Sequence, residues 1–183
     1  MCALPLGEDS LKLRLGLVAA LVITSAAAFT SPASASDGSD DGSSTLPMSP
    51  DAEENCMIVL APMQKGESES RIVEHRCSSD PAELAPDTGH VIIMTWYAAA
   101  NFGDPHTDIY VWWGTCDRQG YGISDVGAAW AARISSFAVW GACQYTDAWD
   151  QTSYTGDHTV YSGNVAYVGD SWNDRIRSMW VTS

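Results

Sequence analysis

Residues 126–139 and 168–181 are two copies of one sequence, offset by 42 residues. The copies align without a gap, and seven of the 14 positions are identical. Self-similarity at a fixed offset indicates one supersecondary unit used twice, because each copy is too small to bury its own apolar face. The repeat therefore predicts one domain from about Val91 to Ser183, with repeats at about 97–139 and 140–181. The identical residues of the first copy are Val126, Gly127, Trp130, Arg133, Ile134, Ser136 and Val139.

Short runs rich in aromatic and β-branched residues fill this domain, and all eight tryptophans lie between Trp96 and Trp180. Such runs favour strands, and Gly, Asn and Asp turn signals separate them. Regularly spaced strands without a helical period predict an antiparallel sandwich, and a repeat of this size holds about four strands, as a Greek key does. The repeated Trp130, Ile134, Trp172 and Ile176 are expected in its core. The strand-like runs are 90–97, 107–113, 133–140, 159–161 and 175–181.

Two motifs of the repeated domain resemble βγ-crystallins. Residues 97–103, Tyr-Ala-Ala-Ala-Asn-Phe-Gly, look like the aromatic corner that opens a βγ-crystallin Greek key, although Asp104 stands where the family usually has glycine. Residues 172–178 look like its closing calcium signature: Asn/Asp, Asn/Asp, two free positions, Ser/Thr and Ser. In the second copy either Trp149 or Tyr154 could be the second aromatic of the corner. The resemblance implies an all-β, βγ-crystallin-like Greek-key sandwich, related to secreted bacterial metalloproteinase inhibitors of this fold.

The resemblance also implies one weak calcium site. The first copy has Ala131 and Ala132 at the two acidic or amide positions but keeps its serines, whereas the second keeps Asn173 and Asp174 but has Arg177 at the hydroxyl position. Since βγ-crystallin motifs exchange ligands, one oxygen site remains, and the reciprocal pair of Ala132 and Arg177 should exclude calcium, which needs six to eight oxygens. Alternatively, Asn173 and Asp174 only cap a turn. The implied ligands are Ser135, Asp174, Asn173 and the carbonyl of Arg133.

The N-terminus is typical of a secretory signal peptide. Lys12 and Arg14 precede an apolar run at 15–28, and Ala33-Ser34-Ala35 supplies the small residues that signal peptidase reads. The run is shorter than the roughly 20 apolar residues of a spanning helix, which disfavours a membrane anchor. We therefore expect an extracellular protein that leaves the membrane after cleavage of residues 1–35.

Residues 36–55 are rich in Ser, Asp, Gly and Pro and carry acidic residues throughout. Such a segment buries too little apolar surface to offset its ordering entropy, so it is predicted to be a disordered linker. A calcium-collecting acidic arm is the alternative reading of the same composition.

Four cysteines remain once Cys2 is removed with the leader. An even number in an oxidising compartment indicates disulfides, for which three pairings are possible. Residues 56–90 are predicted to form a β-hairpin module whose ends meet, which favours Cys56 with Cys77 and leaves Cys116 with Cys143. Zinc is disfavoured because no Cys-x-x-Cys spacing occurs.

Charge and motifs exclude several classes of function. The formal net charge of −14 argues against a nucleic-acid partner, which requires a basic surface. The four histidines lie in different segments, and the chain has no His-Glu-x-x-His, Gly-x-Ser-x-Gly or phosphate-loop motif. The protein is therefore predicted not to be an enzyme.

Three functions fit the remaining features of this chain, which we expect to be a monomer. The first is a secreted structural or stress protein linked to calcium. The second, implied by the resemblance, is an inhibitor of an extracellular protease, with residues 114–120 as the contact loop. The third is a toxin-like module or one that binds cell-surface glycans by stacking on Trp112, Trp113 or Trp149. Fold alone does not separate them.

Overall fold

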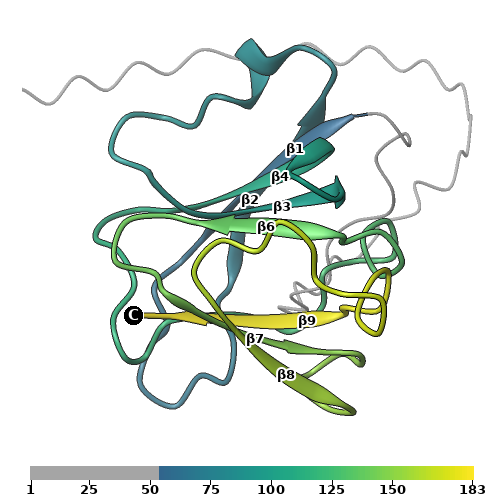
Figure 1. Ribbon diagram of the computed structural model, residues 1–183. Coiled ribbons are helices and arrows are strands. Elements are labelled where there is room, and N and C mark those ends of the chain that lie inside the picture. The colour runs from purple at the N-terminus through teal and green to yellow at the C-terminus, as the bar shows by residue number, and fades with distance from the viewer. Residues whose placement is uncertain (1–53) are drawn as a thin grey trace, which may run out of the picture. The chain divides into compact units, whose positions relative to one another are not determined.

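The computed structural model describes residues 54–183, in which the chain forms nine strands and one short 3-10 helix (Figure 1). The strands build a five-stranded sheet of order β2-β1-β4-β3-β6 and a four-stranded sheet of order β5-β9-β7-β8. The predicted signal peptide and nearly all of the predicted linker lie outside the described residues. The strands are β1 (Asn55–Leu60), β2 (Ile72–Ser78), β3 (Val91–Ala99), β4 (Gly103–Val111), β5 (Tyr121–Ile123), β6 (Ser136–Val139), β7 (Tyr145–Trp149), β8 (His158–Ser162) and β9 (Ser178–Thr182), and the helix is η1 (Pro81–Leu84).

Each Greek key gives one segment to the sheet of the other: the first key gives strand β5, and the second gives a single bridge residue. The first key consists of β3, β4, β5 and β6, but β5 leaves its own sheet and pairs with β9 of the second key. The second key consists of β7, β8 and β9, and its segment at Val165 crosses back to form a bridge with Phe137 of β6. The predicted all-β, βγ-crystallin-like Greek-key sandwich is therefore confirmed by its topology.

Hydrogen bonds between the two copies follow the same symmetry. The N–H of Val168 donates to the carbonyl of Ser135 at 3.0 Å, and the N–H of Val126 donates to the carbonyl of Arg177 at 2.9 Å. These four residues are two pairs of repeat equivalents, each 42 positions apart. The sequence repeat thus corresponds to a pseudo-twofold arrangement in which each copy satisfies the backbone of the other.

A buried serine closes the aromatic corner of the first key. The Ser136 hydroxyl accepts a hydrogen bond from the N–H of Phe102 at 3.0 Å and donates one to the carbonyl of Ala99 at 2.6 Å. Phe102 has a φ of 63°, a left-handed conformation that rarely suits a bulky residue. The serine therefore stabilises a tight turn that the backbone would not adopt readily alone.

The second key repeats this corner and settles its register. Ser178 accepts from the N–H of Tyr154 at 3.1 Å and donates to the carbonyl of Gln151 at 2.7 Å. Tyr154 is thus the second aromatic and Trp149 the first. The two rings pack edge to face with centroids 5.3 Å apart, compared with 5.6 Å for Tyr97 and Phe102.

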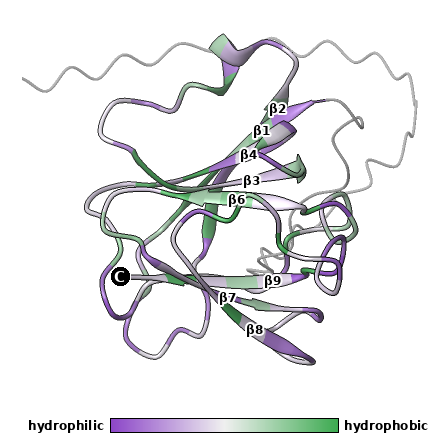
Figure 2. Cartoon of the chain, viewed as in Figure 1, coloured by the Kyte–Doolittle hydropathy of each residue, from purple (hydrophilic) through white to green (hydrophobic). Residues whose placement is uncertain are grey.

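The core lies between the two sheets. Figure 2 shows hydrophobic residues concentrated along the strands and hydrophilic residues in many of the connecting turns. Ile134 and Ile176 are fully buried and Trp130 nearly so, as the repeat predicts, while Trp172 packs against the cluster and stays partly exposed. Edge-to-face packing of Trp96 on Trp130, with centroids 6.0 Å apart, joins the first sheet to the repeat segment.

The N-terminal hairpin extends the sheet of the first key. β1 pairs antiparallel with β2 and parallel with β4, where Cys56 lies opposite Thr107. Residues 57–60 of β1 are fully buried. The predicted linker ends one residue too late, because Asn55 already belongs to β1 and its side chain accepts a hydrogen bond from the N–H of His106.

We predict that Ser136→Ala and Ser178→Ala each lower the free energy of unfolding by about 1–3 kcal/mol, because each leaves a corner N–H and carbonyl without their partner. Urea denaturation followed by tryptophan fluorescence measures the loss. Ser162→Ala, at an exposed position of β8, should change stability by less than about 0.5 kcal/mol. Equal losses of stability in all three variants would contradict the role of Ser136 and Ser178 in stabilising the corners.

Candidate functional site

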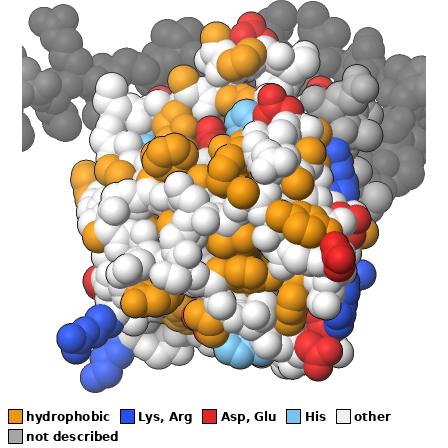
Figure 3. Space-filling view, viewed as in Figure 1, with side chains coloured by type: hydrophobic (Ala, Val, Ile, Leu, Met, Phe, Trp, Pro, Cys, Tyr) orange, Lys and Arg blue, Asp and Glu red, His pale blue; other side chains and the backbone are white. Residues whose placement is uncertain are grey.

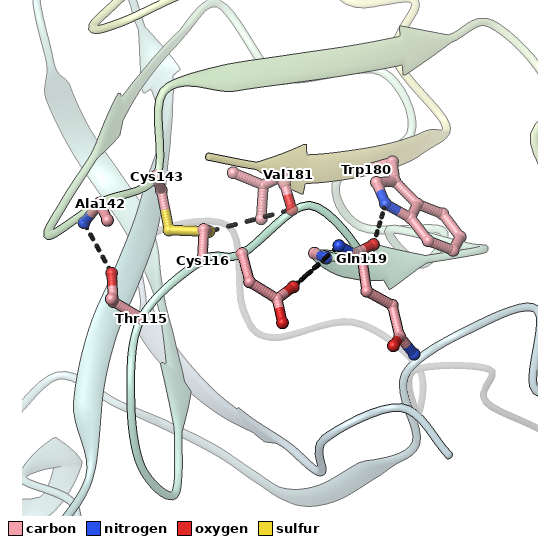
Figure 4. The surroundings of a disulfide bond; sticks show 9 residues. Thr115, Cys116, Gln119, Ala142, Cys143, Trp180 and Val181 are labelled. Carbon is pink, nitrogen blue, oxygen red and sulfur yellow. Dashed lines mark hydrogen bonds between the residues drawn. A yellow bond between two sulfur atoms is a disulfide. The ribbon is translucent and has the colours of Figure 1, made fainter. Parts of the chain in front are cut away.

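The loop between β4 and β5, residues 112–120, is exposed but attached at several points. Its disulfide joins Cys116 to Cys143, in the turn before β7 (Figure 4). The hydroxyl of Thr115 accepts a hydrogen bond from the N–H of Ala142 at 2.6 Å, next to the disulfide. The loop is therefore fastened to the second Greek key by one covalent bond and one short hydrogen bond.

The tip of the loop is held by its own aspartate. One oxygen of Asp117 accepts hydrogen bonds from the N–H groups of Gln119 and Gly120, at 2.8 and 2.9 Å. The carbonyl of Asp117 accepts from the N–H of Ser183 at 3.0 Å. Gly120 has a φ of 70°, and a Cβ there would lie 2.2 Å from the carbonyl oxygen of Val181, so only glycine fits.

Two further side chains hold the loop from opposite sides. The indole N–H of Trp180 on β9 donates to the carbonyl of Gln119 at 2.9 Å, as Figure 4 shows. The amide of Gln119 donates to the carbonyl of Met63 in the turn of the N-terminal hairpin, at 3.3 Å. Burial, and then the Asp117 carboxylate, raise the pKa of the neighbouring Tyr121.

The loop presents aromatic and cationic side chains to solvent. Trp113 is 72% exposed and Trp112 40% exposed. Arg118 is exposed at the tip and makes no ion pair with any residue in the described part of the chain. The ring of Trp112 lies tilted against that of His90, with centroids 4.5 Å apart, and the ring of Trp113 lies 5.8 Å from that of Trp112.

The tryptophans expected to bind glycans do not form one flat platform. Trp112 is inclined by 49° to His90 and by 56° to Trp113, so the three rings expose edges rather than a continuous plane. Trp149 belongs to the second aromatic corner, where it packs on Tyr154 and stacks on His158. The exposed tryptophans of the loop therefore form no continuous stacking surface.

The predicted calcium ligands lie on two segments that the repeat brings together. The N–H of Asp174 donates to the carbonyl of Ile134 at 3.3 Å, next to Ser135. The Asn173 amide donates to Asp174 Oδ2 at 2.9 Å, while Asn173 Oδ1 is buried without a hydrogen-bond partner. Ser135 itself is buried. The two segments that carry these oxygen ligands, the donor type that calcium prefers, are thus joined by a backbone hydrogen bond.

The arginines of the repeat have a structural contact that the sequence does not predict. The guanidinium of Arg133 lies 5.3 Å from the ring centroid of Trp130, and that of Arg175 lies 5.5 Å from the ring centroid of Trp172. Arg175 also pairs with Asp150 at 2.7 Å. Both side chains thus cover the repeat tryptophans by cation–π contacts. The predicted calcium ligand at Arg133 is its backbone carbonyl, which these side-chain contacts do not involve.

The groups that hold the loop from distant segments could not be identified from the sequence. Trp180 and Met63 contact Gln119 from 61 and 56 positions away. Thr115 was part of the predicted contact loop, but its bond to Ala142 depends on the disulfide geometry. The sequence does contain one signal for this contact: Thr115 is adjacent to Cys116 and must therefore lie close to the cysteine that Cys116 bonds.

The strand exchange and the paired corners define a βγ-crystallin-like domain. The model of peptidase inhibitor family I36 matches residues 142–183, the segment that holds the second Greek key. No curated protein matches the chain. Both the βγ-crystallin fold and the inhibitor family are non-catalytic kinds of protein, and the two disulfides are consistent with an extracellular location.

Several solved structures are similar to this chain. A βγ-crystallin domain from Clostridium beijerinckii is 18% identical, with 49% of this chain and 97% of that chain covered and a TM-score of 0.38. A βγ-crystallin domain from Flavobacterium johnsoniae is 17% identical, with 50% and 94% covered and a TM-score of 0.38. The N-terminal domain of protein S is 17% identical, with 50% and 96% covered and a TM-score of 0.39.

The surface of the domain carries both apolar and acidic side chains. On the face in Figure 3, apolar side chains lie across the middle, and the acidic ones are scattered rather than continuous. Within residues 54–183, no helix has the length and apolar character needed to cross a membrane.

We predict that Cys116→Ser/Cys143→Ser loosens the loop specifically. The variant and its control, Cys56→Ser/Cys77→Ser, remove bonds of similar sequence separation, 27 and 21 residues, so each should lose about 3–4 kcal/mol of unfolding free energy. Trypsin should cleave after Arg118 faster only in the first variant, as mass spectrometry of early digests would measure. Equal cleavage in both variants would mean that the disulfide does not fix the loop.

Proposed function

We propose that this protein is a secreted inhibitor of an extracellular peptidase and that residues 112–120 form its contact loop. The observation that carries the proposal is a loop that is exposed at its tip and yet fixed by a disulfide and by hydrogen bonds from three separate segments. A loop fixed before binding loses little conformational entropy when a peptidase closes on it. The match of residues 142–183 to a peptidase inhibitor family supports the same reading.

Trp113 and Arg118 are the side chains that would make the principal contacts. Tryptophan and arginine are the residue types most often found to dominate binding energy at protein interfaces. Trp113 packs against Trp112, which in turn packs against His90, so its ring would enter a pocket with less loss of freedom than an unsupported side chain. With a net charge of −14, the inhibitor would favour a peptidase whose cleft has a basic or neutral rim.

We predict that the purified chain inhibits a secreted peptidase of the thermolysin type more strongly than trypsin-type and chymotrypsin-type serine peptidases. Trp113→Ala and Arg118→Ala should each raise the inhibition constant about tenfold or more, because each removes an anchor of the interface. Hydrolysis of a fluorogenic peptide at increasing inhibitor concentration measures the constant.

Val160→Ala is the matched control for this experiment. Val160 is 53% exposed on β8, two strands away from β9, so this variant should inhibit as the wild type does. Absence of inhibition of all three peptidases would overturn the proposal. Binding to a glycan array without peptidase inhibition would instead support the carbohydrate-binding function.

A second proposal is one weak calcium site formed by Ser135, Asn173 and Asp174 with the carbonyl of Arg133. It is favoured by the buried Asn173 Oδ1, which lacks a hydrogen-bond partner beside the Asp174 carboxylate. A bound cation would use that oxygen. Carbonyls and water would complete the coordination, because three side chains are fewer than the six to eight oxygens calcium requires.

We predict that calcium raises the melting temperature of the wild type and that Asp174→Ala abolishes this rise. A ligand held only by the native state stabilises it by about 2.7 kcal/mol at a hundred times its dissociation constant. Calorimetry with calcium against chelator measures the difference. Asp170→Ala removes a nearby carboxylate that bonds Tyr167 and should keep the response. A melting temperature independent of calcium in the wild type would exclude the site.

A further inference from the structure

Three potential metal ligands meet on the N-terminal hairpin. Cys56 of β1 lies directly opposite Cys77 of β2, and His75 stands two residues before Cys77 on the same face of β2. Their ligand atoms all lie within 4.8 Å of one another, and they are the one such group found among residues 54–183. His75 Nε2 is 3.4 Å from Cys77 Sγ.

We propose that reduction of the Cys56–Cys77 disulfide converts this cluster into a binding site for a soft divalent metal ion, represented by zinc. Zinc binds thiolate sulfur at about 2.3 Å and imidazole nitrogen at about 2.0–2.1 Å in a tetrahedron, which puts a sulfur and a nitrogen ligand about 3.6 Å apart and two sulfurs about 3.8 Å apart. The histidine and Cys77 already have this spacing.

The conversion needs only a small movement of the sulfurs. Bonded sulfurs lie about 2 Å apart, so the pair must separate by less than about 2 Å to become two zinc ligands. Rotation of the two cysteine side chains can supply this separation while β1 and β2 stay paired. Metal binding would then link the two strands at the same point as the disulfide does.

The chemistry balances with a small-molecule thiol as reductant. Two thiols are oxidised to one disulfide, and the Cys56–Cys77 bond takes up the two electrons and two protons to give two cysteine thiols. Zinc then displaces both thiol protons into solvent, and the neutral imidazole of His75 donates its lone pair. Three protein ligands leave the fourth position of the tetrahedron to water.

The position of the cluster at the edge of the sheet allows the disulfide to be reduced and the metal ion to bind. His75 and Cys77 are half-buried on β2, the outermost strand of its sheet, where a reductant and a metal ion have access. Cys56 is buried and holds the site from the inner strand.

The test uses the secreted chain after reduction by a water-soluble phosphine without oxygen. Cobalt(II) should bind with a thiolate charge-transfer band in the near ultraviolet, and zinc should displace it. The oxidised chain should show no band. Cys116→Ser/Cys143→Ser leaves only the proposed pair and should bind as the wild type does, whereas Cys56→Ser/Cys77→Ser should not bind.

His75→Gln isolates the role of the imidazole, because it leaves both cysteines in place. It should weaken zinc binding about tenfold or more, by analogy with the loss caused by altering groups around a metal site, and keep the charge-transfer band. Near-ultraviolet circular dichroism should show a folded chain before and after metal addition. An unchanged zinc affinity in His75→Gln, binding by Cys56→Ser/Cys77→Ser, or a reduced chain that binds no cobalt would overturn the proposal.

Discussion

The reciprocal pairing of one segment of each Greek key with the sheet of the other is the constraint on which the rest of this fold depends. β5 completes the sheet of the second key, and Val165 bridges to β6 of the first. Neither key can satisfy its backbone or bury its apolar face without the other. Ser136 and Ser178 act at the points where each key turns back on itself, and this explains why these serines occur in both copies while the acidic or amide residues of the signature occur in only one.

The sequence repeat predicted the two segments that carry β6 and β9 because those segments combine regular spacing with large apolar residues. It did not predict β5 or β7. β5 is three residues long and contains Gly122, so its strand character comes from pairing with β9 and not from local propensity. Residues 107–113 were predicted as one run, but β4 ends at Val111, because apolar content alone does not distinguish a buried strand from an exposed Trp112-Trp113 pair.

In the candidate site too, features that depend on local sequence could be predicted, whereas contacts with distant segments could not. The cysteine pairing could be inferred from sequence, since it depends on spacing and on an even number of cysteines. What holds the loop could not, because Trp180, Ser183 and Met63 reach it from the two ends of the domain. The strand pattern of residues 71–77 does predict that His75 lies beside Cys77, because residues two apart share one face of a strand.

The N-terminal hairpin connects the two parts of the surface that carry the proposals. Its strand β1 pairs with β4, while its turn reaches the second sheet, where Ser70 donates to the carbonyl of Gly122 at 2.9 Å and Met63 accepts from Gln119. The hairpin therefore supports the contact loop from the side opposite to the Cys116–Cys143 bond. Since Cys56 and Cys77 join β1 and β2 at the end away from this turn, a change in their bonding would leave the hydrogen bonds to the loop in place. The two disulfides thus stabilise separate parts of the molecule, one the contact loop and the other the hairpin edge.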